Sequence, residues 1–128
     1  MSDHVRVLLV DDLKVVRKAV ERLLSAETNL EIVGEAVDGL DAIEQVGRLS
    51  PDVVLMDVSM PRLNGVEATR RLRKEFPKVA VVGLSAHSAD YMAGPMLEAG
   101  AATFLDKNMP LETIAVAIRL AAHEERTR

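Results

Sequence analysis

The chain alternates short apolar runs with amphipathic helical stretches, five times over, and this alternation constrains its fold more than any other feature. Five runs are predicted to be strands, at residues 5–10, 30–35, 52–57, 78–84 and 101–105. The third and fourth runs are nearly continuous in apolar side chains, which is typical of parallel strands covered on both faces. The alternation therefore predicts one α/β domain over residues 1–128.

Helical periodicity supports the segments between the strands. One predicted core-facing stripe in the first helical stretch comprises Val16, Ala19, Val20, Leu23 and Leu24. The last stretch repeats the spacing with Leu111, Ile114, Ala115, Ile118 and Ala122. Helix breakers follow the second, third and fourth stretches at Pro51, Pro77 and Gly100. The pattern favours a five-stranded parallel sheet in the doubly wound order 2-1-3-4-5, with right-handed crossovers.

Composition excludes several classes of function. The chain has no cysteine, which excludes a disulfide framework, a thiolate zinc site and a cysteine nucleophile. Aromatic residues make up only 2%, so an aromatic platform for flavin or single-stranded nucleic acid is not expected. With 16 Lys and Arg against 20 Asp and Glu, the net charge of −4 argues against direct binding of nucleic acid by this domain. No signal-peptide pattern or membrane-length apolar run occurs, so we expect a cytoplasmic protein with no membrane contact.

Polar residues follow four of the five predicted strands. Asp11 and Asp12 follow the first strand, and Asp57 closes the third. Ser85 follows the fourth, and Lys107 lies shortly after the fifth. Singly, each has an ordinary explanation as a helix cap, a turn residue or a solvated charge. Because the predicted strand order brings these ends to one edge of the sheet, beside its switch point, together they predict a functional site.

Three carboxylates at one edge need positive charge nearby to stay ionised together. Two like charges about 4 Å apart repel by about 4 kcal/mol at an effective dielectric of about 20. Three negative charges against the single charge of Lys107 leave a residual charge of minus two, which matches a divalent cation. An all-oxygen site at an open edge favours Mg²⁺ that keeps several waters. A carboxylate beside Mg²⁺ and a lysine is suited to phosphoryl transfer, so the site is predicted to place phosphate on an aspartate.

Four segments carry a resemblance to a known family: DD after the first strand, VVLMDVSMPRLNGVEATRRLR around the third, GLSAH after the fourth and GAATFLDK at the fifth. In these segments, and over essentially its whole length, the chain resembles the CheY-like receiver domain of two-component response regulators. The resemblance implies a flavodoxin-like fold and phosphorelay signal transduction, in which Asp57 accepts phosphate from a phosphohistidine. The donor would be a histidine kinase or a histidine phosphotransfer protein. Such a domain catalyses only its own phosphorylation and slow autodephosphorylation.

The resemblance also implies a set of metal ligands. Asp12, Asp57 and the backbone carbonyl of Ser59 would bind Mg²⁺, with Asp11 acting directly or through water. Ser59 and His87, each two positions beyond a site residue, have two interpretations. They either tune the lifetime of the phosphate or are ordinary solvated loop side chains.

The remaining implied roles concern the phosphate and a conformational switch. Lys107 would pair with Asp57 before phosphorylation and with a phosphoryl oxygen after it. The Ser85 hydroxyl would reach another phosphoryl oxygen, and its movement would open space into which the Phe104 ring rotates. Phe104 has no hydroxyl, unlike the Tyr of many relatives, so any signal at this position depends on burial of the ring. A half-buried strand aromatic accounts for Phe104 equally well.

The fourth helical stretch and the surface add further expectations. Pro95 lacks an amide donor and crowds the preceding turn, which predicts a short, kinked or late-starting helix there. Val116 and Leu120 lie off the apolar stripe of the last helix and mark a candidate surface for a homodimer through the last strand and helices, or for another partner. A basic run is either a solvated face or a contact for an acidic partner; it comprises Arg70, Arg71, Arg73 and Lys74.

Two alternative functions stay open. A Mg²⁺-dependent phosphatase with an aspartyl-phosphate intermediate would share the nucleophile, but it normally carries a second carboxylate two residues on, where Ser59 stands. A receiver-fold interaction module that acts without phosphorylation is the other alternative, and the intact set of site residues argues against it. The sequence identifies neither the kinase, the stimulus, the phosphate lifetime nor the oligomeric state. It also leaves open whether a DNA-binding or kinase output domain belongs to the same protein, and hence whether the output is transcription.

Overall fold

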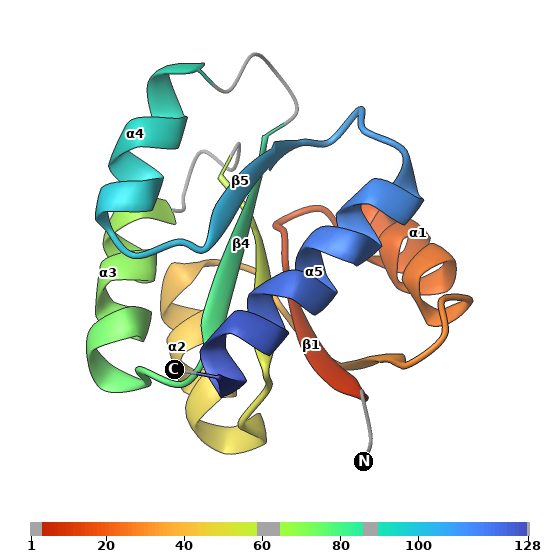
Figure 1. Cartoon of the computed structure of the whole chain (residues 1–128), viewed down its shortest axis with the longest axis horizontal. Coiled ribbons are helices and arrows are strands. Elements are labelled where there is room, and N and C mark those ends of the chain that lie inside the picture. Colours follow the sequence, from red (N-terminus) through yellow and green to blue (C-terminus); the bar gives the residue numbers. More distant parts are fainter. Residues whose placement is uncertain (1–3, 59–64, 86–89, 128) are drawn as a thin grey trace.

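The computed structural model describes residues 4–58, 65–85 and 90–127. Strands and helices alternate in the order β1 (Val5–Val10), α1 (Lys14–Ser25), β2 (Leu30–Ala36), α2 (Gly39–Leu49), β3 (Val53–Asp57), α3 (Gly65–Glu75), β4 (Ala80–Ser85), α4 (Asp90–Glu98), β5 (Thr103–Asp106) and α5 (Leu111–Arg126). Figure 1 shows a twisted central sheet with α1 and α5 on one face and α2, α3 and α4 on the other. The predicted α/β architecture is confirmed.

The sheet is parallel, with strand order β2-β1-β3-β4-β5, as the alternation predicted. Residue Val10 near the end of β1 registers with Met56 of β3, and Asp57 registers with Leu84 of β4. The carboxyl ends of β1 and β3 therefore lie side by side at the point where the strand order reverses. In doubly wound sheets this switch point is where ligands bind.

The predicted strand bounds hold for β1 and shift by one to two residues elsewhere. Asp52 precedes β3, and its carboxylate accepts a hydrogen bond from the Arg6 amide at 2.8 Å. Ala101 precedes β5 because its amide closes the end of α4, donating to the Met96 carbonyl at 3.0 Å. At Ala101 this hydrogen bond occupies a backbone amide that the apolar pattern had assigned to the strand.

Helix ends coincide with the predicted breakers. α2 ends at Leu49, followed by Ser50 in the left-handed region at φ 49° and then by Pro51. Past α4, Gly100 has φ 110°, a conformation that a residue with a Cβ rarely adopts. α4 spans nine residues, the fewest among the helices described, and has Pro95 inside it. The prediction of a short fourth helix is confirmed.

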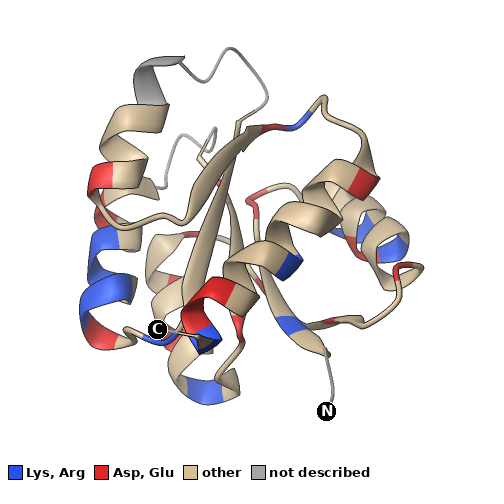
Figure 2. Ribbon diagram, in the orientation of Figure 1, with Lys and Arg blue, Asp and Glu red and all other residues tan. Residues whose placement is uncertain are grey.

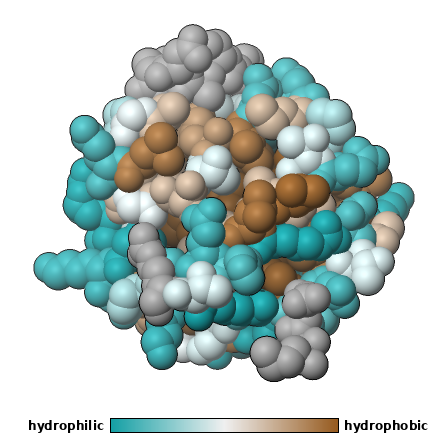
Figure 3. Space-filling model, in the orientation of Figure 1, coloured by the Kyte–Doolittle hydropathy of each residue, from teal (hydrophilic) through white to brown (hydrophobic). Residues whose placement is uncertain are grey.

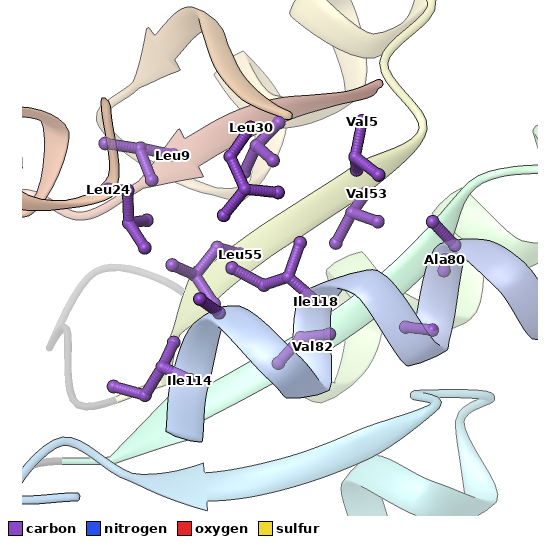
Figure 4. Packing of buried hydrophobic residues seen from close by; sticks show 14 of the residues in the cluster. Val5, Leu9, Leu24, Leu30, Val53, Leu55, Ala80, Val82, Ile114 and Ile118 are labelled. Atoms are coloured by element: carbon purple, nitrogen blue, oxygen red, sulfur yellow. The ribbon is translucent and has the colours of Figure 1, made fainter. Parts of the chain in front are cut away.

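Two apolar clusters cover the two faces of the sheet. The cluster under α1 and α5 includes Leu9, Leu55, Val82 and Ile118, and Figure 4 shows these side chains pointing toward one another. The other cluster, under α2, α3 and α4, takes the alternate strand residues and helix side chains: Leu8, Val10, Val54, Met56, Val81, Leu72 and Met96. Period-two alternation of fully buried side chains explains why these strands are apolar throughout.

The helical stripes were predicted correctly for α5 and only in part for α1. Ile114, Ala115, Ile118 and Ala122 of α5 are buried. In α1, Ala19 is exposed and Leu23 is 54% exposed, so the prediction that they face the core is wrong. The core-facing row of α1 follows a single i, i+4, i+8 spacing: Val16 and Val20 are half-buried and Leu24 is buried. Within the described residues, no helix is both long and apolar enough to cross a membrane.

Candidate functional site

Three charged residues meet at the carboxyl edge of the sheet. Asp11 directly follows β1, Asp57 ends β3, and Lys107 directly follows β5. The Lys107 Nζ lies 2.6 Å from Oδ2 of Asp57 and 3.1 Å from Oδ2 of Asp11. The three residues are far apart in the chain, so their convergence is a product of strand order.

Local hydrogen bonds position the lysine. The Lys107 amide donates to the carbonyl of Ser85 at 2.8 Å. The carboxylate of Asp106 accepts the Asn108 amide at 2.8 Å and so shapes the turn that follows β5. Because β4 lies between β3 and β5, the Lys107 side chain reaches Asp57 across the end of β4.

Both carboxylates are withdrawn from solvent: Asp11 and Asp57 are each 5% exposed. Burial raises the pKa of Asp11; hydrogen bonds from the Leu13 amide and from Lys107 oppose this, while neighbouring Asp57 adds to it. For Lys107, burial works to lower the pKa, but the hydrogen bonds and charges of Asp57 and Asp11 outweigh it, so the pKa is raised. Two carboxylates share one ammonium, and the site therefore has an excess of negative charge.

The donor set at this edge suits a hard cation, although its geometry is incomplete. Within residues 4–58, 65–85 and 90–127, no three His, Cys, Asp or Glu side chains lie close enough to hold a metal ion. Asp12 is half-buried, and among the described residues it forms no such group with Asp11 and Asp57. Ser59 lies outside the described residues, so its carbonyl stays a predicted ligand. The chemistry nevertheless fits Mg²⁺, since two buried carboxylates supply oxygen donors and too little positive charge balances them.

The predicted switch residues lie on the two strands beside this cluster. Ser85 ends β4, is 7% exposed and registers with Asp106 of β5. Phe104 lies on β5, half-buried, with its ring packed against the cluster under α4. His87, the other candidate after β4, lies outside the described residues.

Gly83 is a further residue of this region that the sequence reasoning missed. It registers with Phe104, and a Cβ added to Gly83 would lie 2.6 Å from Cδ1 of the Phe104 ring and 3.0 Å from Cε of Met96. The ring can occupy its position only because residue 83 has no side chain. A glycine inside an otherwise apolar strand signals such a close approach, although it does not identify the neighbour.

Three of the four residues in the basic run on α3, visible in Figure 2, have hydrogen-bond or ion-pair partners within the chain. Arg70 pairs with Glu67 at 2.6 Å, and Arg71 lies 3.5 Å from Glu75. Arg73 turns inward, donating to the carbonyls of Pro77 and Val79. These contacts favour the interpretation of a solvated, internally paired face.

Comparisons with known sequences agree with one another. The sequence model of the response regulator receiver domain family matches residues 7–119. The transcriptional regulatory protein DegU of Brevibacillus brevis is 37% identical over 121 residues, which are 94% of this chain and 51% of DegU. The response regulator GacA of Pseudomonas viridiflava is 40% identical over 116 residues, which are 91% of this chain and 54% of GacA. The chain thus spans about half the length of these curated relatives.

Solved structures show the same similarity. The signal receiver domain of NarL from Mycobacterium tuberculosis superposes with a TM-score of 0.86 at 34% identity, covering 94% of this chain and 97% of that one. The response regulator domain of CheB from Thermotoga maritima gives a TM-score of 0.82 at 31% identity, with the same coverage of 94% and 97%.

Proposed function

Because this chain belongs to the receiver domain family of two-component response regulators, which acts in phosphorelay signalling, we propose that Asp57 is its phosphoacceptor. The donor in this proposal is a phosphohistidine on a histidine kinase or a histidine phosphotransfer protein. The observation that carries it is the 2.6 Å contact between the Lys107 ammonium and the Asp57 carboxylate at the switch-point edge of the sheet. We also propose that residues 1–128 form one receiver domain and that this domain is located in the cytoplasm.

In the proposed reaction, a carboxylate oxygen of Asp57 attacks the phosphorus of the phosphohistidine. The new O–P bond forms an acyl phosphate while the N–P bond breaks, and the imidazole of the donor leaves with its electron pair and takes up a proton. Lys107 moves from the carboxylate to a phosphoryl oxygen. Its raised pKa supports this role, because the ammonium then stays charged at neutral pH and can neutralise that oxygen.

The proposed Mg²⁺ ligands are the carboxylates of Asp12 and Asp57 and the carbonyl of Ser59, with Asp11 acting directly or through water. When bound, Mg²⁺ supplies charge neutralisation for the transferring phosphoryl group. The excess of carboxylate charge over Lys107 supports this set, since a nearby cation would relieve the repulsion between Asp11 and Asp57.

The proposed output begins at Ser85 and Phe104. The Ser85 hydroxyl would contact a phosphoryl oxygen, and the Phe104 ring would move from its place on Gly83 and Met96 toward the space that Ser85 leaves. This changes the face formed by α4, β5 and α5, where apolar side chains gather in Figure 3. Val116 and Leu120 of α5 are 50% and 55% exposed and belong to the proposed homodimer or partner surface. Control of transcription through an output domain is the proposed downstream effect.

The test is phosphorylation with a small acyl phosphate in the presence of Mg²⁺, followed by intact-protein mass spectrometry. The wild type should gain one phosphoryl group, Asp57→Asn should gain none, and Glu75→Gln, a carboxylate at the end of α3 and thus at the opposite edge of the sheet, should behave as the wild type. Turnover of varied phosphate esters would indicate the phosphatase instead. Absence of any phosphoprotein, with this donor and with a phosphorylated histidine kinase, would favour the interaction module.

A further inference from the structure

Arg17 of α1 connects the backbone of the acidic site to the edge strand of the sheet. Its Nη1 donates to the backbone carbonyl of Asp11 at 2.7 Å, and its Nε donates to Oε1 of Glu35 at 2.8 Å. Glu35 lies near the end of β2, and its other oxygen accepts Lys18 Nζ at 3.1 Å. The Arg17 side chain is 11% exposed, so these contacts are well shielded from water.

The carbonyl that Arg17 binds belongs to the peptide bond between Asp11 and Asp12. Because a peptide unit is planar, fixing its oxygen fixes the orientation of the Asp12 amide and restricts where the Asp12 side chain leaves the backbone. A second hydrogen bond fixes the turn that follows β1: Oδ1 of Asp11 accepts the Leu13 amide at 2.9 Å. Arg17 therefore acts on the backbone geometry of both adjacent acidic residues without touching either carboxylate.

Arg17 also borders the site itself. With Asp11, Asp57 and Lys107 it lines a small hollow of about 20 Å³ between α1 and the carboxyl edge of the sheet. Glu35 keeps the arginine in place: burial works to raise the pKa of Glu35, but the hydrogen bonds from Arg17 and Lys18 outweigh it and lower that pKa. The Arg17–Glu35 pair is thus ionised at neutral pH, and the charge of Arg17 is balanced outside the acidic cluster.

We propose that Arg17, held by Glu35, is a positioning residue that orients the Asp11–Asp12 peptide for binding of a divalent cation. This inference rests on the proposed function, which assigns these aspartates to Mg²⁺. Residues that orient metal ligands from behind typically change metal affinity by about 10- to 100-fold when replaced. We expect Arg17→Met to weaken cation binding by about tenfold, the lower end of that range, because Arg17 acts through the backbone.

The experiment titrates Mn²⁺, a paramagnetic substitute for Mg²⁺, into the unphosphorylated full chain and follows free Mn²⁺ by electron paramagnetic resonance. Arg17→Met should raise the dissociation constant with unchanged stoichiometry. Arg17→Lys keeps the charge but cannot donate in the same fork to both acceptors, so its affinity should fall between those of the wild type and Arg17→Met. Urea unfolding of each variant shows separately how much stability is lost.

Arg119→Met is the matched control. Arg119 also joins a backbone carbonyl to a carboxylate, donating to Thr28 at 2.7 Å and lying 3.3 Å from Glu27, but it does so ahead of β2, at the opposite edge of the sheet. It should lose stability without changing Mn²⁺ affinity. Equal affinity of the wild type and Arg17→Met, or an equal loss in Arg119→Met, would overturn the inference. If Arg17→Met does not fold, an unchanged affinity of Arg17→Lys would do the same.

These outcomes separate the inference from the proposed function. If the wild type binds Mn²⁺ and is phosphorylated on Asp57 while the Arg17 variants bind as tightly, only the role of Arg17 is wrong. If the wild type binds no Mn²⁺, the proposed metal site fails and the role of Arg17 fails with it.

Discussion

The ammonium of Lys107 and the carboxylate of Asp57 form an ion pair at 2.6 Å although 50 positions separate the two residues in the chain. The pair spans the end of β4, whose last residue, Ser85, accepts the amide of Lys107. Strand order therefore creates the pair, and it gives the two buried carboxylates of Asp11 and Asp57 one ammonium to share.

Replacing Lys107 with Met should destabilise the folded chain at neutral pH. Breaking a fully buried pair costs about 3–5 kcal/mol; because the Lys107 side chain is 21% exposed, we expect about 2 kcal/mol. The folded-state pKa of Lys107 is raised, so the contribution is fully present below the ordinary value of 10.5 and is lost as the pH rises through the folded-state pKa. Urea unfolding at neutral pH measures the loss. Arg71→Met, which removes an exposed ion pair, should lose far less, and equal losses would contradict the expectation.

Replacing Asp11 with Asn should stabilise the protein at neutral pH when Mg²⁺ is absent. The pKa of Asp11 is raised by burial, so its ionised form costs folding free energy once the pH exceeds its ordinary value of 3.8. In that region the folded state binds more protons than the unfolded state, and wild-type stability falls as the pH rises. Asn removes this charge and keeps an oxygen for the Leu13 amide. The gain over the wild type, measured by urea unfolding, should shrink as the pH approaches 3.8; a constant gain at all pH values would refute this explanation.

Gly83→Ala tests the contact that sets the resting position of Phe104. The added Cβ would lie 2.6 Å from the ring, so we expect overpacking to cost about 1–3 kcal/mol. Phe104→Leu in the same background should recover part of the loss, which a double-mutant cycle measures. Gly94→Ala is the control: no atom lies within 4 Å of its added Cβ, and in a helix the change should be neutral or stabilising by up to about 1 kcal/mol. Strictly additive effects of Gly83→Ala and Phe104→Leu would show that the two residues do not compete for space.

The sequence was sufficient to predict the features that depend on hydrophobic periodicity and on strand order. The alternation of strands and helices, together with the helix breakers, predicted the strand order. That order brings Asp57 and Lys107 together. The exposure of Leu23 was missed because helical periodicity allows a wider apolar stripe than the row of α1 that faces the core. The role of Arg17 could not be predicted, since it binds a backbone carbonyl, and every residue offers one. Asp12 was expected beside Asp57 from the strand order and from the family resemblance, yet the direction of a side chain within a turn is not encoded in sequence spacing.

Chemical trapping of the phosphorylated residue tests the central claim most directly. Borohydride reduces an aspartyl phosphate to homoserine, so the full chain is incubated with Mg²⁺ and a small acyl phosphate, reduced, digested and sequenced by mass spectrometry. The account predicts homoserine at position 57 alone, dependent on both Mg²⁺ and the donor, and absent when Mg²⁺ is chelated. Homoserine at position 11 or 12, or unmodified Asp57 in a chain that carries phosphate elsewhere, would contradict it.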